Sequence, residues 1–248
     1  MDCFGSTDIG KRRALNQDCF RIVYAKDFLI SLVCDGMGGA NGGNIASAIA
    51  ADVFCTRLSD EISSSSAPSY DNIKEYINNA LIEANRAVYE KSKSDPVLDG
   101  MGSTLVAFVS DGKAFYTANI GDSRAYYIPS ESGEIIKLTK DHSLVQSLID
   151  SGIITEDEAA EHPNRNIIMR AVGVDEIAEP DIISHNLCGG RVLLCSDGLS
   201  GYFHFDDSYK NILTDMTDPE NTVNRLIEYA NRCGGSDNIT AVIIRLQS

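Results

Sequence analysis

The stretch FLISLVCDGMGG, residues 28–39, ends a run of seven apolar or small residues on an aspartate and a chain of glycines. An uninterrupted apolar run of this length predicts a strand that is buried on both faces. A carboxylate at the end of such a strand is costly to bury unless another group compensates its charge. Taken alone, the stretch therefore predicts a core strand that ends in a turn at Asp35.

Four further aspartates lie beside other predicted strands. Each one alone is typical of a turn, because Asp-Gly and Ser-Asp-Asn are ordinary turn sequences. If the strand ends converge, carboxylates ~4 Å apart repel by about 4 kcal/mol per pair at an effective dielectric near 20, and the set stays ionised only beside a cation. The four are Asp18 in NQD, Asp122 in ANIGDSR, Asp197 in RVLLCSDG and Asp237 in GGSDNITAVII.

The types of ligand select the cation. Aspartate carboxylates, a backbone carbonyl and water favour magnesium or manganese, and zinc is disfavoured because no histidine or cysteine joins the set. The glycine after Asp35 fits this interpretation, since a residue without a Cβ lets the Gly36 carbonyl approach an ion that Asp35 holds.

Composition limits the classes of protein. At 248 residues with 43% hydrophobic content, the chain is long enough for one domain, residues 1–248, that buries roughly three quarters of its unfolded surface. No segment reaches the ~18 apolar residues of a membrane helix, and the N-terminus lacks a signal peptide pattern. The net charge of -15 argues against nucleic acid. The seven cysteines, without a CxxC pair, indicate core residues in a reducing compartment. We therefore expect a cytoplasmic protein without membrane insertion.

Apolar periodicity predicts a mixed chain in which strands outnumber helices. Helices are expected over 44–58, 71–91 and 218–234, and the Ser-rich residues 59–71 are expected to form a surface loop. A polar, helix-prone insertion at about 141–171 predicts a small flap over one end of the sheet. Strands are expected at 19–25, 28–34, 103–109, 113–120, 125–128, 191–195 and 239–246.

Other kinds of site find no support in the sequence. The glycines after Asp35 follow a strand and precede a helix, but Asn41 stands where the dinucleotide fingerprint requires glycine. No P-loop and no GxSxG elbow occurs. None of the four histidines has an evident serine or cysteine partner.

Nine motifs, taken in chain order, resemble those of the bacterial metal-dependent protein phosphatases, the PPM or type 2C serine/threonine phosphatases. The match spans nearly the whole chain, and nine ordered motifs are far more specific than one Asp-Gly pair. They are TDIGKRR (7–13), NQD (16–18), CDGMGG (34–39), MGSTL (101–105), NIGDSR (119–124), LTKDHS (138–143), HPNRNIIMRAVG (162–173), LLCSDGLS (193–200) and SDNITAVI (236–243).

The resemblance implies an α+β fold, a four-layer αββα sandwich of two antiparallel sheets flanked by helices, with a small flap and a two-metal centre at one end. In such enzymes the aspartate matching Asp35 bridges both ions and the carbonyl matching Gly36 binds one of them. The aspartates matching Asp197 and Asp237 bind the other ion. Asp122 matches a ligand of a third, weaker metal in bacterial members, although Gly201 stands where many relatives carry a further aspartate.

Other matched residues act beside the ions. The resemblance implies that Arg13 holds the substrate phosphate, with a solvated basic patch over residues 11–13 as the alternative, and that Asp18 acts through metal-bound water. His162 is the nearest candidate for protonating the leaving group, with a flap-stabilising role as the alternative. Gln17 stands where many members have glutamate, and Met37 stands where animal members have a histidine proposed as the acid.

The implied function is hydrolysis of phosphoserine and phosphothreonine in proteins by a water that two manganese or magnesium ions activate. The implied partners are phosphorylated proteins and a cognate serine/threonine kinase pathway, and we expect a monomer. A catalytically silent phosphoprotein-binding member and a hydrolase of small phosphate esters are the alternatives. The presence of Asp35, Asp197 and Asp237 together favours an active enzyme over a silent member.

Overall fold

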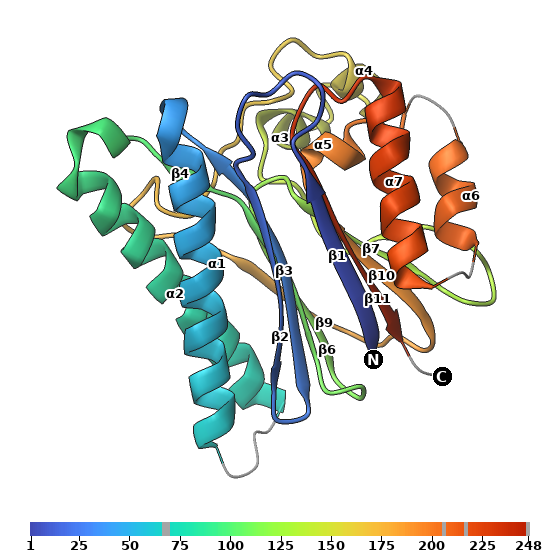
Figure 1. The fold of residues 1–248 in the computed structure, drawn as a ribbon, viewed down its shortest axis with the longest axis horizontal. Helices are drawn as coiled ribbons and strands as arrows, with labels where there is room; N and C mark the ends of the chain where they lie inside the picture. Colours follow the sequence, from blue (N-terminus) through green and yellow to red (C-terminus); the bar gives the residue numbers. More distant parts are fainter. Residues whose placement is uncertain (66–69, 205–206, 216–217, 247–248) are drawn as a thin grey trace.

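Two antiparallel sheets lie face to face, with helices covering both outer sides (Figure 1). The computed structural model describes residues 1–65, 70–204, 207–215 and 218–246, without the side chains of residues 39–41, 70 and 71. Within the described residues, no helix combines the length and the apolar character that crossing a membrane requires.

The first sheet has six strands, in the order β2-β3-β5-β6-β9, with β4 paired to the end of β3 outside that order. All of its pairings are antiparallel. The strands are β2 (Asp18–Ala25), β3 (Phe28–Met37), β4 (Gly102–Ser103), β5 (Leu105–Ser110), β6 (Phe115–Ile120) and β9 (Asp181–His185).

The second sheet has five strands, in the order β1-β11-β10-β7-β8, again all antiparallel. Its second strand, β11, comes from the C-terminal end of the chain and pairs with β1 from the N-terminal end, so the two ends of the sequence lie side by side (Figure 1). The strands are β1 (Asp2–Asp8), β7 (Arg124–Ile128), β8 (Ile136–Lys137), β10 (Gly190–Cys195) and β11 (Ile239–Leu246).

Helices form the two outer layers and the connections at one end. The long helices α1 and α2 cover the six-stranded sheet, while α5, α6 and α7 cover the five-stranded sheet (Figure 1). This arrangement confirms the expected four-layer αββα sandwich. The helices are α1 (Gly39–Ser64), α2 (Tyr70–Ser94), the 3₁₀ turn η1 (Pro96–Leu98), α3 (Leu144–Asp150), α4 (Glu156–Ala160), α5 (Asp197–Ser200), α6 (Ser208–Thr214) and α7 (Pro219–Cys233).

The position of β3 explains its uninterrupted apolar sequence. Leu29 and Val33 point into the core between the two sheets, while Ile30, Leu32 and Cys34 point toward α1 and α2. Because a strand alternates its side chains between two faces, and both faces are buried here, no position from Phe28 to Cys34 can be polar except the small Ser31. The strand emerges from this core only at Asp35.

The insertion between β8 and β9 carries α3 and α4. Isolated bridges join Ser143 to Ile168 and Ser103 to Val172, so the insertion leaves and rejoins the sandwich close to the end of β3. Figure 1 shows α3 and α4 at the end of the molecule where the loop between β1 and β2 also lies. We call residues 141–171 the flap, as the sequence predicted.

The sequence patterns missed three edge strands, β1, β8 and β9, because β1 and β9 are only partly buried, β8 is a short exposed strand, and the apolar pattern of all three is weak. The surface loop expected over 59–71 is wrong at its start, since α1 continues to Ser64, and residues 66–69 lie outside the described residues. All seven cysteines are free; Cys34, Cys55 and Cys195 are buried, but Cys188 is exposed, which contradicts a core position for that residue.

Candidate metal centre

The ends of β2 and β3 bring two of the predicted aspartates together. The antiparallel register places Asp18 directly opposite Asp35, and opposite residues in such a pair project their side chains on the same face. Both residues lie where the strands leave the core, and Asp18 remains only 9% exposed. Two carboxylates therefore share one buried face of the sheet.

Backbone contacts from the MGSTL segment hold Asp35 in place. The Asp35 N–H donates to Thr104 Oγ1 (2.9 Å), and the Asp35 carbonyl accepts hydrogen bonds from the Thr104 N–H (2.8 Å) and from Ser103 Oγ (3.1 Å). Thr104 Oγ1 is in turn hydrogen-bonded to Ser123 Oγ (2.7 Å), next to Asp122. Sequence reasoning recognised this motif but gave its hydroxyl groups no role.

Asp197 and Asp237 reach the same place from the other sheet. Asp197 begins α5 directly after β10, and Asp237 directly precedes the residue that leads into β11. A Cβ on Gly198 would lie 1.9 Å from the Asn238 carbonyl oxygen, so only glycine lets these two segments approach each other. Asn238 Oδ1 accepts the Gln17 N–H (2.8 Å), which ties the β11 segment to the loop before Asp18.

Burial and mutual repulsion dominate the electrostatics of the cluster. Burial, with nearby carboxylates, raises the pKa of Asp18 to about 7 and the pKa of Asp122 to about 7. Burial raises the pKa of Asp35 well above its ordinary range, and the charges of Asp18, Asp197, Asp122 and Asp237 raise it further. The pKa of Asp197 is also raised, by burial and by Asp237. These shifts are the response expected of carboxylates that lack a compensating cation.

Among the described residues, Arg13 forms the only ion pair with any of these five aspartates. Its Nη2 donates to Asp237 Oδ2 at 2.6 Å, and the Arg13 side chain is 49% exposed. The hydrogen bond from Arg13 to Asp237 raises the pKa of the guanidinium. The contact places Arg13 at the rim of the centre, and it leaves Asp35 and the more deeply buried Asp18 and Asp122 without an ion pair within the described structure.

Three buried oxygens show that the residues present suit a hard cation. Oδ1 of Asp18, Oδ1 of Asp122 and Oδ1 of Asp197 have no hydrogen-bond partner among the described residues. A buried acceptor left without a partner costs roughly 1–3 kcal/mol, and more if it is charged. Carboxylate oxygens are the ligands that magnesium and manganese prefer, so bound cations would satisfy all three atoms.

The described residues contain no group of three or more His, Cys, Asp or Glu side chains that could hold a metal ion as they stand. Two of the aspartates already have partners within the chain, which explains this absence among the described residues. Asp237 is engaged by Arg13, and one oxygen of Asp18 accepts a hydrogen bond from Ser196 Oγ (2.7 Å). Cation binding therefore requires carboxylates to exchange these partners.

The structure brings Asp122 close to Asp197. Asp122 lies in the turn between β6 and β7 and is 8% exposed, and the negative charge of Asp197 is the largest electrostatic cause of its raised pKa. Gly201, where a further carboxylate was expected from the resemblance, ends α5 and lines the same cleft as Asp122 and Asp197.

Gly36 has a packing role that the sequence did not indicate. A Cβ on Gly36 would lie 2.0 Å from the Gly43 carbonyl oxygen, and a Cβ on Gly43 would lie 2.6 Å from the Gly36 carbonyl oxygen. The two glycines thus allow the first turns of α1 to rest on β3, which is why α1 begins at Gly39 rather than at the expected residue 44. The proposed contact of the Gly36 carbonyl with an ion stays a prediction.

Two clefts lie beside the centre, one lined by Asp122 and Asp197 and the other by Asp197 and Asp237, and His162 lines neither of them. Its Nδ1 accepts a hydrogen bond from the Asn164 N–H (3.1 Å) inside its own turn of the flap, and this contact favours the flap-stabilising role. Arg165, three residues later, lines both clefts instead, together with Asp197 and Gly201. The sequence gave no separate signal for Arg165, because its position depends on the path of the flap.

His142 links the flap to the turn that carries Asp122. Its ring Nδ1 accepts a hydrogen bond from the Gly121 N–H (3.2 Å). The backbone N–H of His142 donates to the Gly121 carbonyl (2.9 Å), and the His142 carbonyl accepts from the Met169 N–H (2.7 Å). Burial lowers the pKa of His142, so the neutral ring acts as the acceptor. Its Nε2 lies 3.2 Å from Asp181 Oδ2, so its partners are backbone groups and a carboxylate of β9, and none is the serine or cysteine that the sequence analysis considered.

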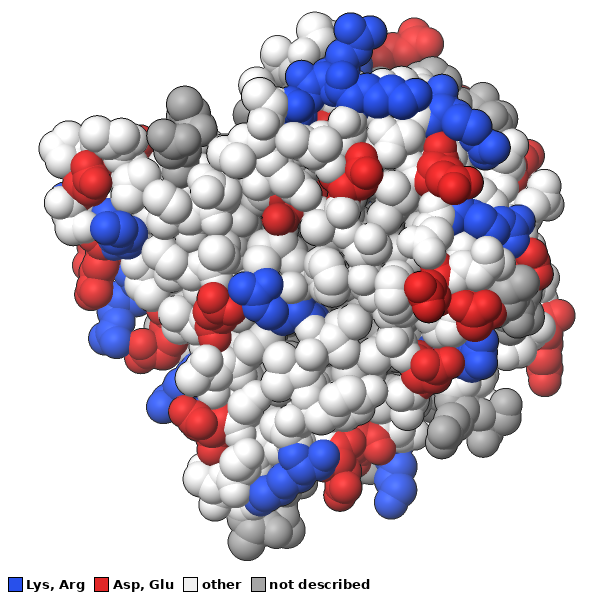
Figure 2. Space-filling model, viewed as in Figure 1, with Lys and Arg blue, Asp and Glu red and all other residues white. Residues whose placement is uncertain are grey.

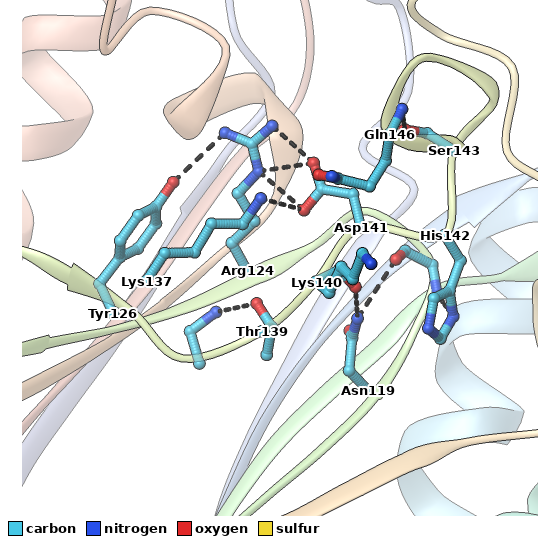
Figure 3. Close-up of polar contacts among 12 residues, drawn as sticks. Asn119, Arg124, Tyr126, Lys137, Thr139, Lys140, Asp141, His142, Ser143 and Gln146 are labelled. Atoms are coloured by element: carbon cyan, nitrogen blue, oxygen red, sulfur yellow. Dashed lines mark hydrogen bonds and ion pairs between the residues drawn. The ribbon is translucent and has the colours of Figure 1, made fainter. Parts of the chain in front are cut away.

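Asp141 forms a separate cluster with Arg124 and Lys137. All three residues line the same cleft of about 330 Å³ as Asp122 and Asp197. Arg124 donates from Nε to both oxygens of Asp141 (3.1 and 3.0 Å) and from Nη2 to Oδ2 (2.7 Å), and Lys137 Nζ lies 2.7 Å from Oδ1 (Figure 3). Asp141 is therefore compensated by two cationic side chains of the chain itself.

Comparisons with known proteins agree with the geometry. A family profile described as protein phosphatase 2C matches residues 9–233. The serine/threonine protein phosphatase PstP of Mycobacterium tuberculosis is 38% identical over 239 residues, which cover 96% of this chain and 43% of PstP. The serine/threonine phosphatase stp of Listeria monocytogenes is 34% identical over 241 residues, which cover 96% of this chain and 93% of that protein.

Solved structures give the same result. The serine/threonine phosphatase Stp1 from Staphylococcus aureus matches with a TM-score of 0.89 at 31% identity, covering 99% of this chain and 95% of that chain. The chain belongs to the protein phosphatase 2C family, which confirms the family indicated by the motifs. It spans less than half the length of its mycobacterial relative and nearly the whole length of its listerial relative.

Proposed function

We propose that the chain hydrolyses phosphoserine and phosphothreonine esters in proteins with the help of bound manganese or magnesium. The observation that carries this proposal is the convergence of five aspartates from both sheets, three of which keep a buried oxygen without a hydrogen-bond partner in the described structure. Such a set has no use in a protein that only packs its core, because it costs stability unless cations are bound.

The residues that would hold the cations follow from their positions. Asp35 is affected by the charges of all four other aspartates and would contact two ions, one of them shared with the Gly36 carbonyl. Asp197 and Asp237 would hold the second ion, and Asp122 would contribute to a third. When bound, the ions would activate a water molecule and offset the charge that develops on the phosphoryl oxygens.

Arg13 would bind the phosphate group. Its planar guanidinium uses only one nitrogen on Asp237 and is half-exposed, so it can present two donors to phosphate oxygens once Asp237 turns to a cation. Asp18, with one oxygen held by Ser196 Oγ and the other without a hydrogen-bond partner among the described residues, would accept a hydrogen bond from water at the centre. Both roles use groups that the described structure leaves partly available.

The leaving group would take its proton from water. Met37 has no acidic group at the position where animal relatives carry the proposed acid, and the His162 Nδ1 is engaged within the flap. His162 as a substrate contact remains the weaker proposal. The expected biological setting is a cytoplasmic monomer that acts on phosphoproteins and opposes a serine/threonine kinase.

Phosphate release from a phosphothreonine peptide tests the proposed function. With manganese added, we expect sustained turnover; with excess chelator, turnover should fall to the background level. A parallel assay with a small aryl phosphate separates a protein phosphatase from a hydrolase of small esters. Turnover that survives removal of every divalent cation would overturn the cation mechanism, and binding of the phosphopeptide without turnover in any metal would identify a silent member.

A further inference from the structure

Two arginines line one cleft beside the candidate metal centre. Arg12, in the loop between β1 and β2, and Arg165, in the flap, line a cleft of about 610 Å³ that Asp197 and Asp237 also line. Both side chains are exposed. A peptide whose phosphorylated residue reached the aspartates would therefore run past both guanidinium groups.

Neither arginine has a partner in the described part of the chain. The side chains of Arg12 and Arg165 form no ion pair and no hydrogen bond there, and the same holds for the neighbouring exposed Lys11 and Arg232. Most other described lysines and arginines form an ion pair with a carboxylate, as in the pairs of Arg21, Arg57, Arg86, Lys93, Lys140, Arg170, Lys210, Arg225 and Arg245. Unpaired cations thus gather beside this cleft.

The surface view shows the same concentration. Figure 2 shows Lys and Arg atoms gathered at the end of the molecule that carries the loop between β1 and β2 and α4 in Figure 1, whereas the rest of that face mixes both signs. The chain as a whole has a net charge of -15, so a local excess of positive charge contrasts with the average surface. The excess attracts anionic ligands to the rim of the cleft.

The acidic groups of the cleft do not cancel this excess. Asp237 is paired with Arg13, and Asp197 belongs to the candidate centre, where cations would compensate it. Glu161 also lines the cleft and forms no ion pair with Arg165 in the described structure. One glutamate therefore shares the lining of the cleft with Arg12 and Arg165.

We propose that Arg12 and Arg165 form a second anion subsite, which takes an acidic side chain or a second phosphate next to the phosphorylated residue. This inference rests on the proposed function and names its substrate class: acidic or multiply phosphorylated segments of proteins. Arginine suits the role because its fork of donors matches carboxylate and phosphate oxygens. Basic segments are disfavoured, because they place like charges beside the two arginines.

The test compares three phosphothreonine peptides of one length whose residues on both sides of the phosphothreonine are glutamate, alanine or lysine. For the wild-type chain with manganese at low salt, kcat/KM should be about tenfold higher for the glutamate peptide than for the lysine peptide. The ratio should shrink as the salt concentration rises, since the contacts are partly solvent-exposed. Equal kcat/KM values for the three peptides would overturn the subsite.

Charge-reversed variants make the assignment specific. In Arg12→Glu/Arg165→Glu, the preference should invert toward the lysine peptide, whereas Lys113→Ala, which removes an exposed lysine on the turn between β5 and β6, should keep the wild-type ratio. A ratio that stays unchanged in the double variant would show that other residues set the preference.

Peptide binding separates this inference from the proposed function. Fluorescence anisotropy with labelled peptides in chelator measures affinity without turnover, and the glutamate peptide should bind more tightly than the lysine peptide to the wild-type chain only. If no peptide is hydrolysed but this difference is found, the subsite stands and the hydrolytic function fails. If all peptides are hydrolysed at equal rates and bind equally, the function stands and the subsite fails.

Discussion

The cluster of Asp141 with Arg124 and Lys137 and the aspartate cluster of the candidate centre meet at one cleft, which Asp122 and Asp197 line from the second cluster. The two clusters are built in opposite ways. Asp141 is held by three hydrogen bonds from Arg124 and by Lys137, and its side chain is only 7% exposed. Asp18 and Asp122 are buried to a similar degree and Asp35 is half-buried, but no lysine or arginine of the described structure forms an ion pair with any of the three. The first cluster is complete without a ligand, and the second is not.

The difference distinguishes a structural carboxylate from a binding carboxylate. A buried charge is tolerated when its partners come with the fold, and it then stabilises that fold only modestly. A buried set of like charges without partners costs stability, and a protein retains it when a ligand supplies the compensation. Four predictions, from the largest expected effect to the smallest, test this comparison.

Replacing Asp35 should have the largest effect on activity. Asp35→Asn and, separately, Asp237→Asn should reduce phosphate release with manganese by about 10³-fold or more, because each removes a cation ligand whose contribution is several kcal/mol. The thermal stability of the metal-free protein should stay equal or rise, since one repelling carboxylate is gone. Near-normal turnover in both variants would remove the site assignment.

Replacing Asp141 should have the opposite pattern. Asp141→Asn should lower the free energy of unfolding by about 3 kcal/mol, because Arg124 and Lys137 lose their partner in a largely buried place. Saturating manganese should still support turnover within about tenfold of wild type. Denaturant unfolding measures the loss, and Asp150→Asn, which breaks the exposed pair with Lys140, should cost less than about 1 kcal/mol.

Cation binding should depend on pH. The pKa of Asp18 and that of Asp122 are raised from 3.8 to about 7 in the metal-free protein, so the folded state binds protons more tightly than the unfolded chain. That contribution to stability is present below about pH 4 and is lost as the pH rises through 7.

Because cations compete with these protons, manganese should raise the melting temperature by roughly 5 °C more at pH 7.5 than at pH 5.5. Differential scanning calorimetry with manganese and with chelator gives the two shifts. An equal shift at both pH values would show that these carboxylates do not exchange protons for the cation.

Asp122 should give the smallest effect on activity. Asp122→Asn should leave turnover at saturating manganese within about tenfold of wild type, because its proposed ion is additional to the pair held by Asp35, Asp197 and Asp237. The manganese concentration needed for half-maximal activity should rise. A loss as large as that of Asp35→Asn would show that Asp122 belongs to the main centre.

The sequence predicted the parts of the fold and site that depend on local pattern. The apolar run 28–34 identified β3 because both faces of that strand are buried, and the turn sequences before or after the strands identified the aspartates. From the sequence, a cation site followed only if the strand ends converged. The structure shows this convergence for Asp18 and Asp35, which lie opposite each other in the register of β2 and β3. The nine ordered motifs indicated the family.

What the sequence did not predict depends on contacts between distant segments. β1 was missed because its apolar pattern is weak, and its ladder with β11, which joins the two ends of the chain, is visible only in the structure. The beginning of α1 was placed too late because glycine is a poor helix former, and its packing on Gly36 becomes visible only in the structure. Arg12 and Arg165 are 153 residues apart in the sequence. They line one cleft only because the flap folds over the end of the sandwich that carries the loop between β1 and β2.

Calorimetric titration of manganese into the metal-free protein at pH 7.5 tests the central claim most directly. The contrast between the two clusters predicts about two ions per chain for the wild type and for Asp141→Asn, and a clear loss of binding for Asp35→Asn. Retained binding in Asp35→Asn, together with lost binding in folded Asp141→Asn, would contradict the claim that the open cluster is the metal centre.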